Sequence, residues 1–138
     1  MNNMRLRNGF CIVACLLFSG CFGLFDNGTD HIVDNYDVIW IDLHAYRSLC
    51  NTSEIVPAYI AAVGYNSKYL FVKQHPLTGE FDSKVLESVT NYYLIRRTKN
   101  NTQTQPIYGP LSEKDFNKLC DKLEIKDINF STHYPENI

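Results

Sequence analysis

The sequence contains few of the residues that form recognisable catalytic loops. Only seven glycines and five prolines occur among its 138 residues, and no glycine-rich segment has the spacing of a phosphate-binding loop. A Gly-x-Ser-x-Gly turn is also missing. These absences argue against the nucleotide-binding proteins and serine hydrolases that sequence motifs identify.

Metal-binding patterns are equally scarce. The four histidines, His31, His44, His75 and His133, show no i, i+4 spacing and no HExxH-like pattern. Neither Cys50 nor Cys120 has a neighbouring Cys or His at the spacing of zinc ligands. We therefore expect no metal site and no cofactor.

The chain also lacks an excess of positive charge. It has 13 basic and 15 acidic side chains, and the basic ones are dispersed apart from Arg96, Arg97 and Lys99. Such a distribution gives no electrostatic footprint for a polyanion, so we expect no nucleic-acid partner.

No apolar run reaches the roughly 20 residues of a membrane-spanning helix. The N-terminus instead places Arg5 and Arg7 before an apolar stretch at 10–18, which is followed by the small residues Ser19-Gly20 and then Cys21. This order is typical of a bacterial lipoprotein signal. The pattern predicts a signal peptide at 1–20 and lipidation of Cys21, although Phe18 stands where leucine is usual.

Lipidation of Cys21 has consequences for location and charge. Two or more acyl chains, such as palmitate, hold a protein stably on a membrane. We therefore expect a lipid-anchored membrane protein of the bacterial cell envelope, and its processed chain has a net charge of −4.

Other interpretations of the N-terminus remain open. They are a plain signal peptide cut near Ser19 or Gly20, or an uncleaved amphiphilic segment. A eukaryotic secreted protein is a further alternative, because Asn-x-Ser/Thr triplets begin at Asn27, Asn51, Asn100 and Asn129.

The processed chain keeps Cys50 and Cys120 besides the lipid-bearing residue. An oxidising compartment permits a disulfide between them. Free cysteines, however, are usually buried small apolar side chains. We predict that the two are unpaired.

The middle of the chain favours β-strands. After a tether at 21–35, residues 36–43 form an apolar segment in which Trp40 and its neighbours predict a central strand covered on both sides. A loop is expected at 49–53. Residues 55–65 and 69–74 predict a β-hairpin, and residues 91–98 predict another strand, with one of Tyr92 and Tyr93 on each face.

A helix follows these strands. Ser112 and Asp115 have the spacing of an N-terminal capping pair. Phe116, Leu119, Cys120 and Leu123 recur at the spacing of one buried helical face. The order predicts one α+β domain at 36–128, a small antiparallel sheet with a C-terminal amphipathic helix packed on it. A flexible tail is expected at 129–138.

Residues 55–124 resemble a family of small, uncharacterised bacterial lipoproteins classed as a domain of unknown function. The similar segments are 60–65 (Ile-Ala-Ala-Val-Gly-Tyr), 69–76, 92–95 and 108–116. The resemblance implies an envelope location and a strand-rich domain with a terminal helix. It implies no activity, and among functional residues it carries over only the lipid-bearing Cys21.

The functional prediction therefore rests on the lipid anchor and on the absence of a catalytic motif. We expect a non-catalytic binding or accessory domain with an envelope protein as partner. One alternative is an envelope hydrolase whose residues converge in the fold, with Glu80, Asp82, His75 and Arg96 as candidates. Another is an immunity or inhibitor protein.

Overall fold

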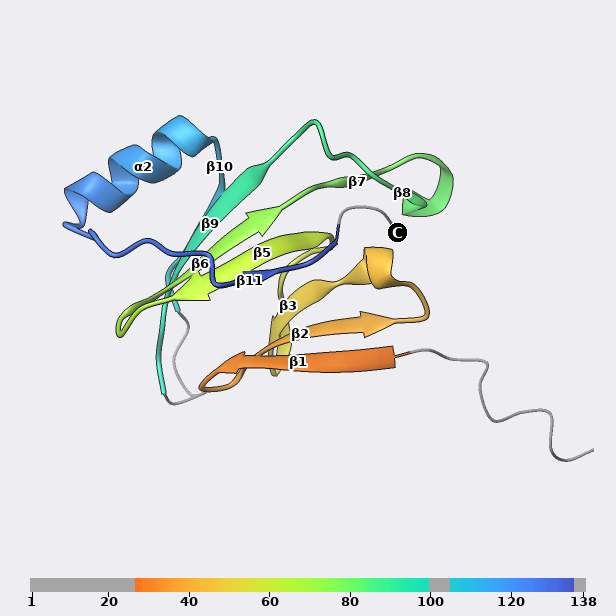
Figure 1. Ribbon diagram of the computed structural model, residues 1–138, viewed down its shortest axis with the longest axis horizontal. Helices are drawn as coiled ribbons and strands as arrows, with labels where there is room; N and C mark the ends of the chain where they lie inside the picture. Colours follow the sequence, from red (N-terminus) through yellow and green to blue (C-terminus); the bar gives the residue numbers. More distant parts are fainter. Residues whose placement is uncertain (1–26, 100–104, 136–138) are drawn as a thin grey trace, which may run out of the picture.

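The structure, a computed structural model, describes residues 27–99 and 105–135 (Figure 1). These residues form a strand-rich α+β domain with two larger antiparallel sheets. Sheet A has the spatial order β1 (Asn27–Val33), β2 (Tyr36–Ile41), β3 (Ser48–Asn51), β4 (Ser53–Val56). Sheet B has the order β10 (Ile107–Leu111), β9 (Asn91–Arg96), β6 (Tyr69–Gln74), β5 (Ile60–Tyr65), β11 (Thr132–His133).

Shorter elements connect the sheets. The 3-10 turn η1 (His44–Tyr46) joins β2 to β3. A two-stranded ribbon of β7 (Leu77–Thr78) and β8 (Lys84–Val85) encloses the turn η2 (Glu80–Asp82), and α2 (Glu113–Lys122) lies between β10 and β11. The fold class is thus α+β as predicted, but with two larger sheets where the sequence suggested one.

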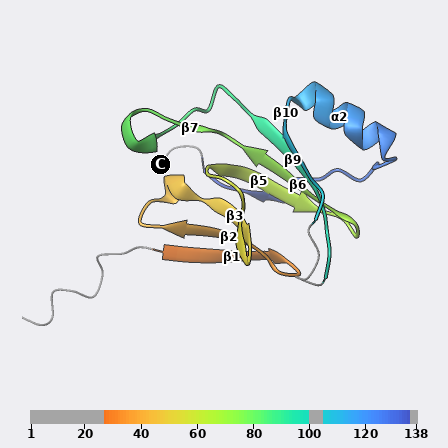
Figure 2. The same cartoon turned by 180° about the vertical axis from the view of Figure 1, so that it is seen from behind.

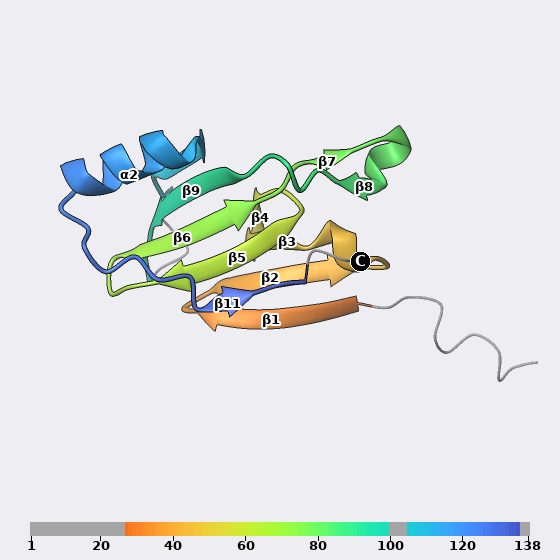
Figure 3. The same cartoon turned by 45° about the horizontal axis from the view of Figure 1, so that its top comes forward.

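The main core lies between the two sheets, which face each other as layers (Figure 3). Strand alternation explains its composition: Leu70 and Val72 of β6 face sheet A, while Phe71 between them faces the opposite side. Tyr93 likewise enters this core and Tyr92 the other face, as predicted. Its buried members are Tyr36, Val38, Leu49, Val56, Tyr59, Ile60, Ala61, Val63, Leu70, Val72, Tyr93, Ile95 and Tyr134.

The predicted hairpin is confirmed by the pairing of β5 with β6, in which Tyr65 lies opposite Leu70. Its turn is closed by Asn66, whose Oδ1 accepts hydrogen bonds from the backbone N–H groups of Lys68 and Tyr69, both at 2.8 Å. An asparagine side chain in this role fixes a tight turn between two strands.

The predicted helix start is also confirmed. Ser112 is the N-cap of α2, and its Oγ accepts a 3.1 Å hydrogen bond from the backbone N–H of Asp115. The helix contacts β9 and β10 (Figure 2) and buries Phe116 and Cys120. A second apolar cluster results on this face, with Phe71, Tyr92, Leu94, Phe116, Cys120 and Ile125 as its buried members.

The predicted tether is wrong for residues 27–33, which form β1. This strand pairs antiparallel with β2, and Asn27 lies opposite Ile41. Its side chains alternate between exposed and partly buried, and the inward positions include Gly28 and Asp30. Because few of them are apolar, the alternation was invisible in the sequence. Residues 21–26 lie outside the described ranges.

The predicted flexible tail is wrong for residues 129–135, and α2 is not the last element. Strand β11 pairs with β5, with Thr132 opposite Val63 and His133 opposite Ala62. The backbone N–H of Tyr134 continues the pairing with a 2.9 Å hydrogen bond to the carbonyl oxygen of Ala61. The described domain therefore extends from residue 27 to residue 135 instead of 36–128.

Two further predictions about sheet A are wrong. The expected loop at 49–53 belongs mainly to β3 and β4. Trp40 is only partly buried, and Ile41 at the end of β2 is 59% exposed. The strand is central in its pairing, but only its inward face, with Tyr36 and Val38, reaches the core.

Candidate functional site

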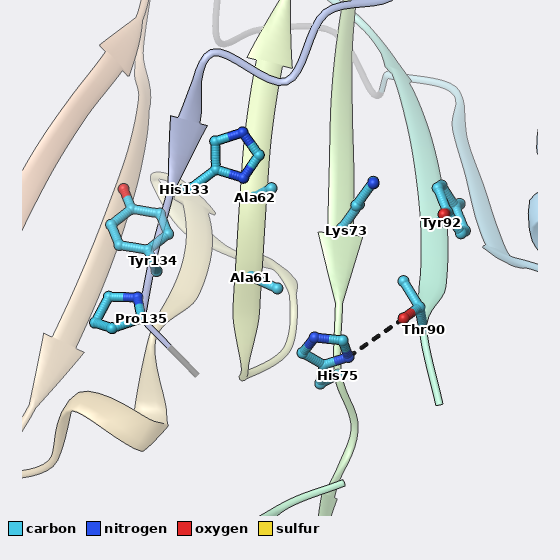
Figure 4. A pocket seen from close by; sticks show the side chains of 9 residues that line it. All are labelled: Ala61, Ala62, Lys73, His75, Thr90, Tyr92, His133, Tyr134 and Pro135. Atoms are coloured by element: carbon cyan, nitrogen blue, oxygen red, sulfur yellow. Dashed lines mark hydrogen bonds between the residues drawn. The ribbon is translucent and has the colours of Figure 1, made fainter. Parts of the chain in front are cut away.

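A groove of about 560 Å³ runs across sheet B over β11, β5, β6 and β9 (Figure 4). This volume is in the range of small-ligand sites. The groove borders the face of the sheet that α2 covers. Tyr92 lies at this border, and its ring centroid is 5.1 Å from that of Phe116 on α2. The lining residues are Ala61, Ala62, Lys73, His75, Thr90, Tyr92, His133, Tyr134 and Pro135.

Four of these residues form a row across the sheet. His133 of β11 pairs with Ala62 of β5, Ala62 pairs with Lys73 of β6, and Lys73 pairs with Tyr92 of β9. Directly opposed residues project on the same face, with Cβ atoms about 5 Å apart. Figure 4 accordingly shows the side chains of His133 and Lys73 on either side of the small Ala62.

The ammonium group of Lys73 is held by aromatic rings. Its Nζ lies 4.7 Å from the ring centroid of Phe130 and 5.5 Å from that of Tyr92. Such cation–π contacts position a cation without neutralising it. No carboxylate within the described ranges lies at ion-pair distance from Lys73. Its charge is therefore available to a ligand in the groove.

His75 is fixed at the end of β6. It is only 5% exposed, and its Nδ1 lies 2.8 Å from the carbonyl oxygen of Val89 and 3.4 Å from Oγ1 of Thr90. Because a carbonyl oxygen can only accept, Nδ1 carries the proton. His75 therefore ties the Val89–Thr90 segment to the floor of the groove.

The groove has the chemistry of an anion site. Its lining includes one lysine, two histidines and the hydroxyl group of Thr90, and no carboxylate. Burial, and then the nearby Glu113 carboxylate, which also accepts a hydrogen bond from the Tyr92 hydroxyl, raises the pKa of Tyr92. A carboxylate or phosphate group is the natural complement of these side chains.

A buried arginine supports the strand that carries His133. The guanidinium carbon of Arg47 lies 4.7 Å from the ring centroid of Trp40 and 4.9 Å from that of Tyr134. Burial, and then the neighbouring Asp30 carboxylate, raises the pKa of Tyr134 well above its ordinary value, while Arg47 opposes the shift. The phenol of Tyr134 therefore stays neutral between the two sheets.

The four candidates for a hydrolase do not converge. His75 lies just beyond the end of β6 that pairs with the start of β9, whereas Arg96 is exposed at the far end of β9, opposite Tyr69. Glu80 and Asp82 are exposed in η2. Asp82 lines a second cavity, of about 620 Å³, that His75 and Arg96 do not line.

The remaining predicted site residues are scattered. Cys21 lies outside the described residues, and Cys50 on β3 and Cys120 on α2 are free thiols. In residues 27–99 and 105–135, no three His, Cys, Asp or Glu side chains are grouped as metal ligands. Over the same ranges, no helix has the length and apolar character needed to cross a bilayer.

Sequence reasoning missed most of the groove. Lys73 could have been found, because alternation within β6 places it on the same face as Phe71. His133 gave no usable pattern, because its strand is two residues long.

The fold and groove define a small two-sheet α+β domain with an anion-complementary surface. The chain belongs to the family described as protein of unknown function (DUF3997), whose model matches residues 31–134. That range includes β11 and the last three residues of β1, so the family domain is larger than the segment 55–124 recognised in the sequence. No curated protein and no solved structure matches the chain.

Proposed function

We propose that this protein is a lipid-anchored, non-catalytic binding domain of the bacterial cell envelope. In this proposal its groove binds an anionic group of another envelope component. The observation that carries the binding function is the row His133–Ala62–Lys73–Tyr92, which presents a cation and hydrogen-bonding side chains on one face.

The sequence before the domain supports the anchor. Basic residues, an apolar stretch, Ser19-Gly20 and Cys21 stand in the order of a lipoprotein signal. The first strand begins at Asn27, six positions after Cys21. An acylated Cys21 would therefore hold the domain close to a membrane surface.

Metabolic labelling tests the anchor. A fatty-acid analogue should label the wild-type protein and leave Cys21→Ser unlabelled, because the thiol is the attachment point. Cys50→Ser is the matched control and should retain the label. Equal labelling of wild type and Cys21→Ser would refute the anchor.

Cross-linking in intact envelopes tests the groove. We expect Lys73→Glu to lose a partner that the wild type captures, because it reverses the charge that meets the anionic group. Lys118→Glu makes the same charge change on the exposed side of α2 and should keep the partner. Mass spectrometry identifies the captured component. Capture that is unchanged by Lys73→Glu would contradict the groove as the binding site.

A further inference from the structure

The most exposed large apolar side chains of the described residues lie in two loops. Phe81 in η2 is 87% exposed, while Ile41 and Leu43, at the end of β2, are 59% and 52% exposed. Large apolar side chains that are exposed next to one another in a small domain indicate a contact surface for a partner.

The two loops are neighbours. The hydroxyl of Tyr46 in η1 donates a 3.4 Å hydrogen bond to the carbonyl oxygen of Phe81 in η2. Tyr46 and Phe81 also line the same cavity of about 620 Å³. Figures 1 and 3 agree in placing η1 and η2 at one end of the molecule, the end at which β1 begins.

This end of the domain is close in sequence to Cys21, the proposed site of the lipid anchor. Asn27, the first residue of β1, pairs directly with Ile41. Six steps of an extended chain separate Cys21 from Asn27, which is about 20 Å at most. Three of the five residues between them, Phe22, Leu24 and Phe25, are themselves apolar.

We propose that Ile41, Leu43 and Phe81 contact the surface of a lipid bilayer and orient the domain on it. The inference rests on the proposed lipidation of Cys21, which supplies the membrane within reach. The β5–β6 turn and α2 lie away from this end in Figure 1, so they would face away from the bilayer.

The charges next to these apolar side chains determine which lipid head groups favour the contact. Asp42 follows Ile41, and Glu80 and Asp82 flank Phe81. These carboxylates stay among the head groups when the apolar side chains enter the interface, and anionic lipids repel them. Neutral phosphatidylcholine therefore favours the contact, and added phosphatidylglycerol weakens it.

Lipid quenching of an introduced indole tests the contact. The lipidated full chain carrying Phe81→Trp is placed in phosphatidylcholine vesicles with brominated acyl chains, and the emission of wild-type protein is subtracted. Bromine quenches only nearby indoles, so we expect loss of the added emission and a shift to shorter wavelength. Tyr108→Trp, on the edge strand β10 near α2, is the control and should keep its emission.

A second comparison distinguishes failure of the membrane contact from failure of the lipid anchor. Adding Ile41→Ser and Leu43→Ser to Phe81→Trp should reduce the quenching, and replacing part of the lipid with phosphatidylglycerol should reduce it too. A chain that carries the lipid and stays on the vesicle, yet shows equal quenching at positions 81 and 108, overturns the membrane contact alone. A chain without lipid overturns the anchor on which it rests.

Discussion

At the scale of single residues, burial separates the two thiols of the domain. Cys120 is 1% exposed on the inner face of α2, and burial, followed by the Asp121 carboxylate, raises the pKa of its thiol. Cys50 is only partly buried on β3, where its Sγ lies 3.7 Å from Oγ of Ser48. Since the thiolate is the reactive form, the two should differ in reactivity.

A thiol reagent should therefore modify Cys50 in the folded protein and Cys120 only after unfolding. Mass spectrometry of peptides, taken over a time course in buffer, measures the two rates. The fully denatured chain is the control, in which both cysteines should react. Faster labelling of Cys120 than of Cys50 under native conditions would contradict the burial of Cys120 between α2 and the sheet.

Some buried residues could be predicted from the sequence and others could not. Phe116 and Cys120 were predictable, because the i, i+4 spacing identifies one helical face. Arg47 was not, because a charged side chain is expected at the surface. It is 7% exposed, and its guanidinium lies against the rings of Trp40 and Tyr134, which are 94 positions apart in the sequence.

At the scale of elements, β11 depends on a close backbone approach. An added Cβ at Gly64 of β5 would collide with the backbone of Asn129 and Phe130. Only glycine leaves room for the segment that leads into β11. This segment carries Phe130, which contacts Lys73, and His133, so the groove depends on it.

We expect Gly64→Ala to release the segment 129–135 from β5. Hydrogen exchange should then speed up at Tyr134, whose N–H is bonded to Ala61, while amides of the β6–β9 pair keep their protection. Ser67→Ala, in the exposed turn of the same hairpin, is the control and should leave exchange unchanged. Unchanged protection at Tyr134 in the glycine variant would contradict the tight approach.

A partly buried ion pair between Arg97 and Asp34 links the two sheets. Nε and Nη2 of Arg97 donate hydrogen bonds to Oδ2 of Asp34 at 2.9 and 2.7 Å, joining the end of β9 to the β1–β2 turn. The two side chains are only 12% and 17% exposed. Arg97 also donates to the carbonyl oxygen of Asn66.

Asp34→Asn should lower the free energy of unfolding by about 1.5–3 kcal/mol, the range for hydrogen bonds to charged groups. The exposed pair of His31 and Asp37, with side chains 65% and 34% exposed, provides the comparison. Asp37→Asn should cost less than about 1 kcal/mol, because solvent screens such pairs. Urea denaturation measures both, and equal losses would show that the Asp34 pair does not hold the sheets together.

Elements with strong local patterns were predictable, and those defined by distant partners were not. The β5–β6 hairpin and α2 carry apolar periodicity, a turn asparagine and an N-cap serine. Strands β1 and β3 instead mix polar and apolar residues, and β11 has two residues. They become strands because neighbours pair with them, and single-sequence periodicity contains no information on pairing.

At the scale of the whole molecule, one shared core joins both sheets. Val38 and Leu49 come from sheet A, while Val63 and Val72 come from sheet B. Alternation within each strand predicted inward and outward faces, but it could not say which strands share a sheet. The sequence therefore predicts one sheet, whereas the chain folds into two layers with a helix on the outer face of sheet B.

The inter-sheet core and the cluster beneath α2 together bury phenols from several strands, so the stability of the domain should fall at alkaline pH. Burial raises the pKa of Tyr36, Tyr92, Tyr93 and Tyr134 above the ordinary value of 10.0. Below pH 10 both the folded and unfolded states keep these protons, so stability is complete. Above it the unfolded chain releases them first, and the free energy of unfolding falls as pH rises.

Tyr134, the most strongly shifted, should account for up to about 1.4 kcal/mol of this fall per pH unit above pH 10. Tyr134→Phe should flatten the fall by that amount, because the unfolded chain then has one phenol fewer to ionise. Urea denaturation at a series of alkaline pH values measures the slope. Leu119→Ala is the control: it removes apolar packing without removing a titrating group, so it should lower stability equally at every pH. A slope that Tyr134→Phe leaves unchanged would place the Tyr134 hydroxyl in solvent instead of between the sheets, and the stacking of Arg47 on its ring would lose its role in holding β11.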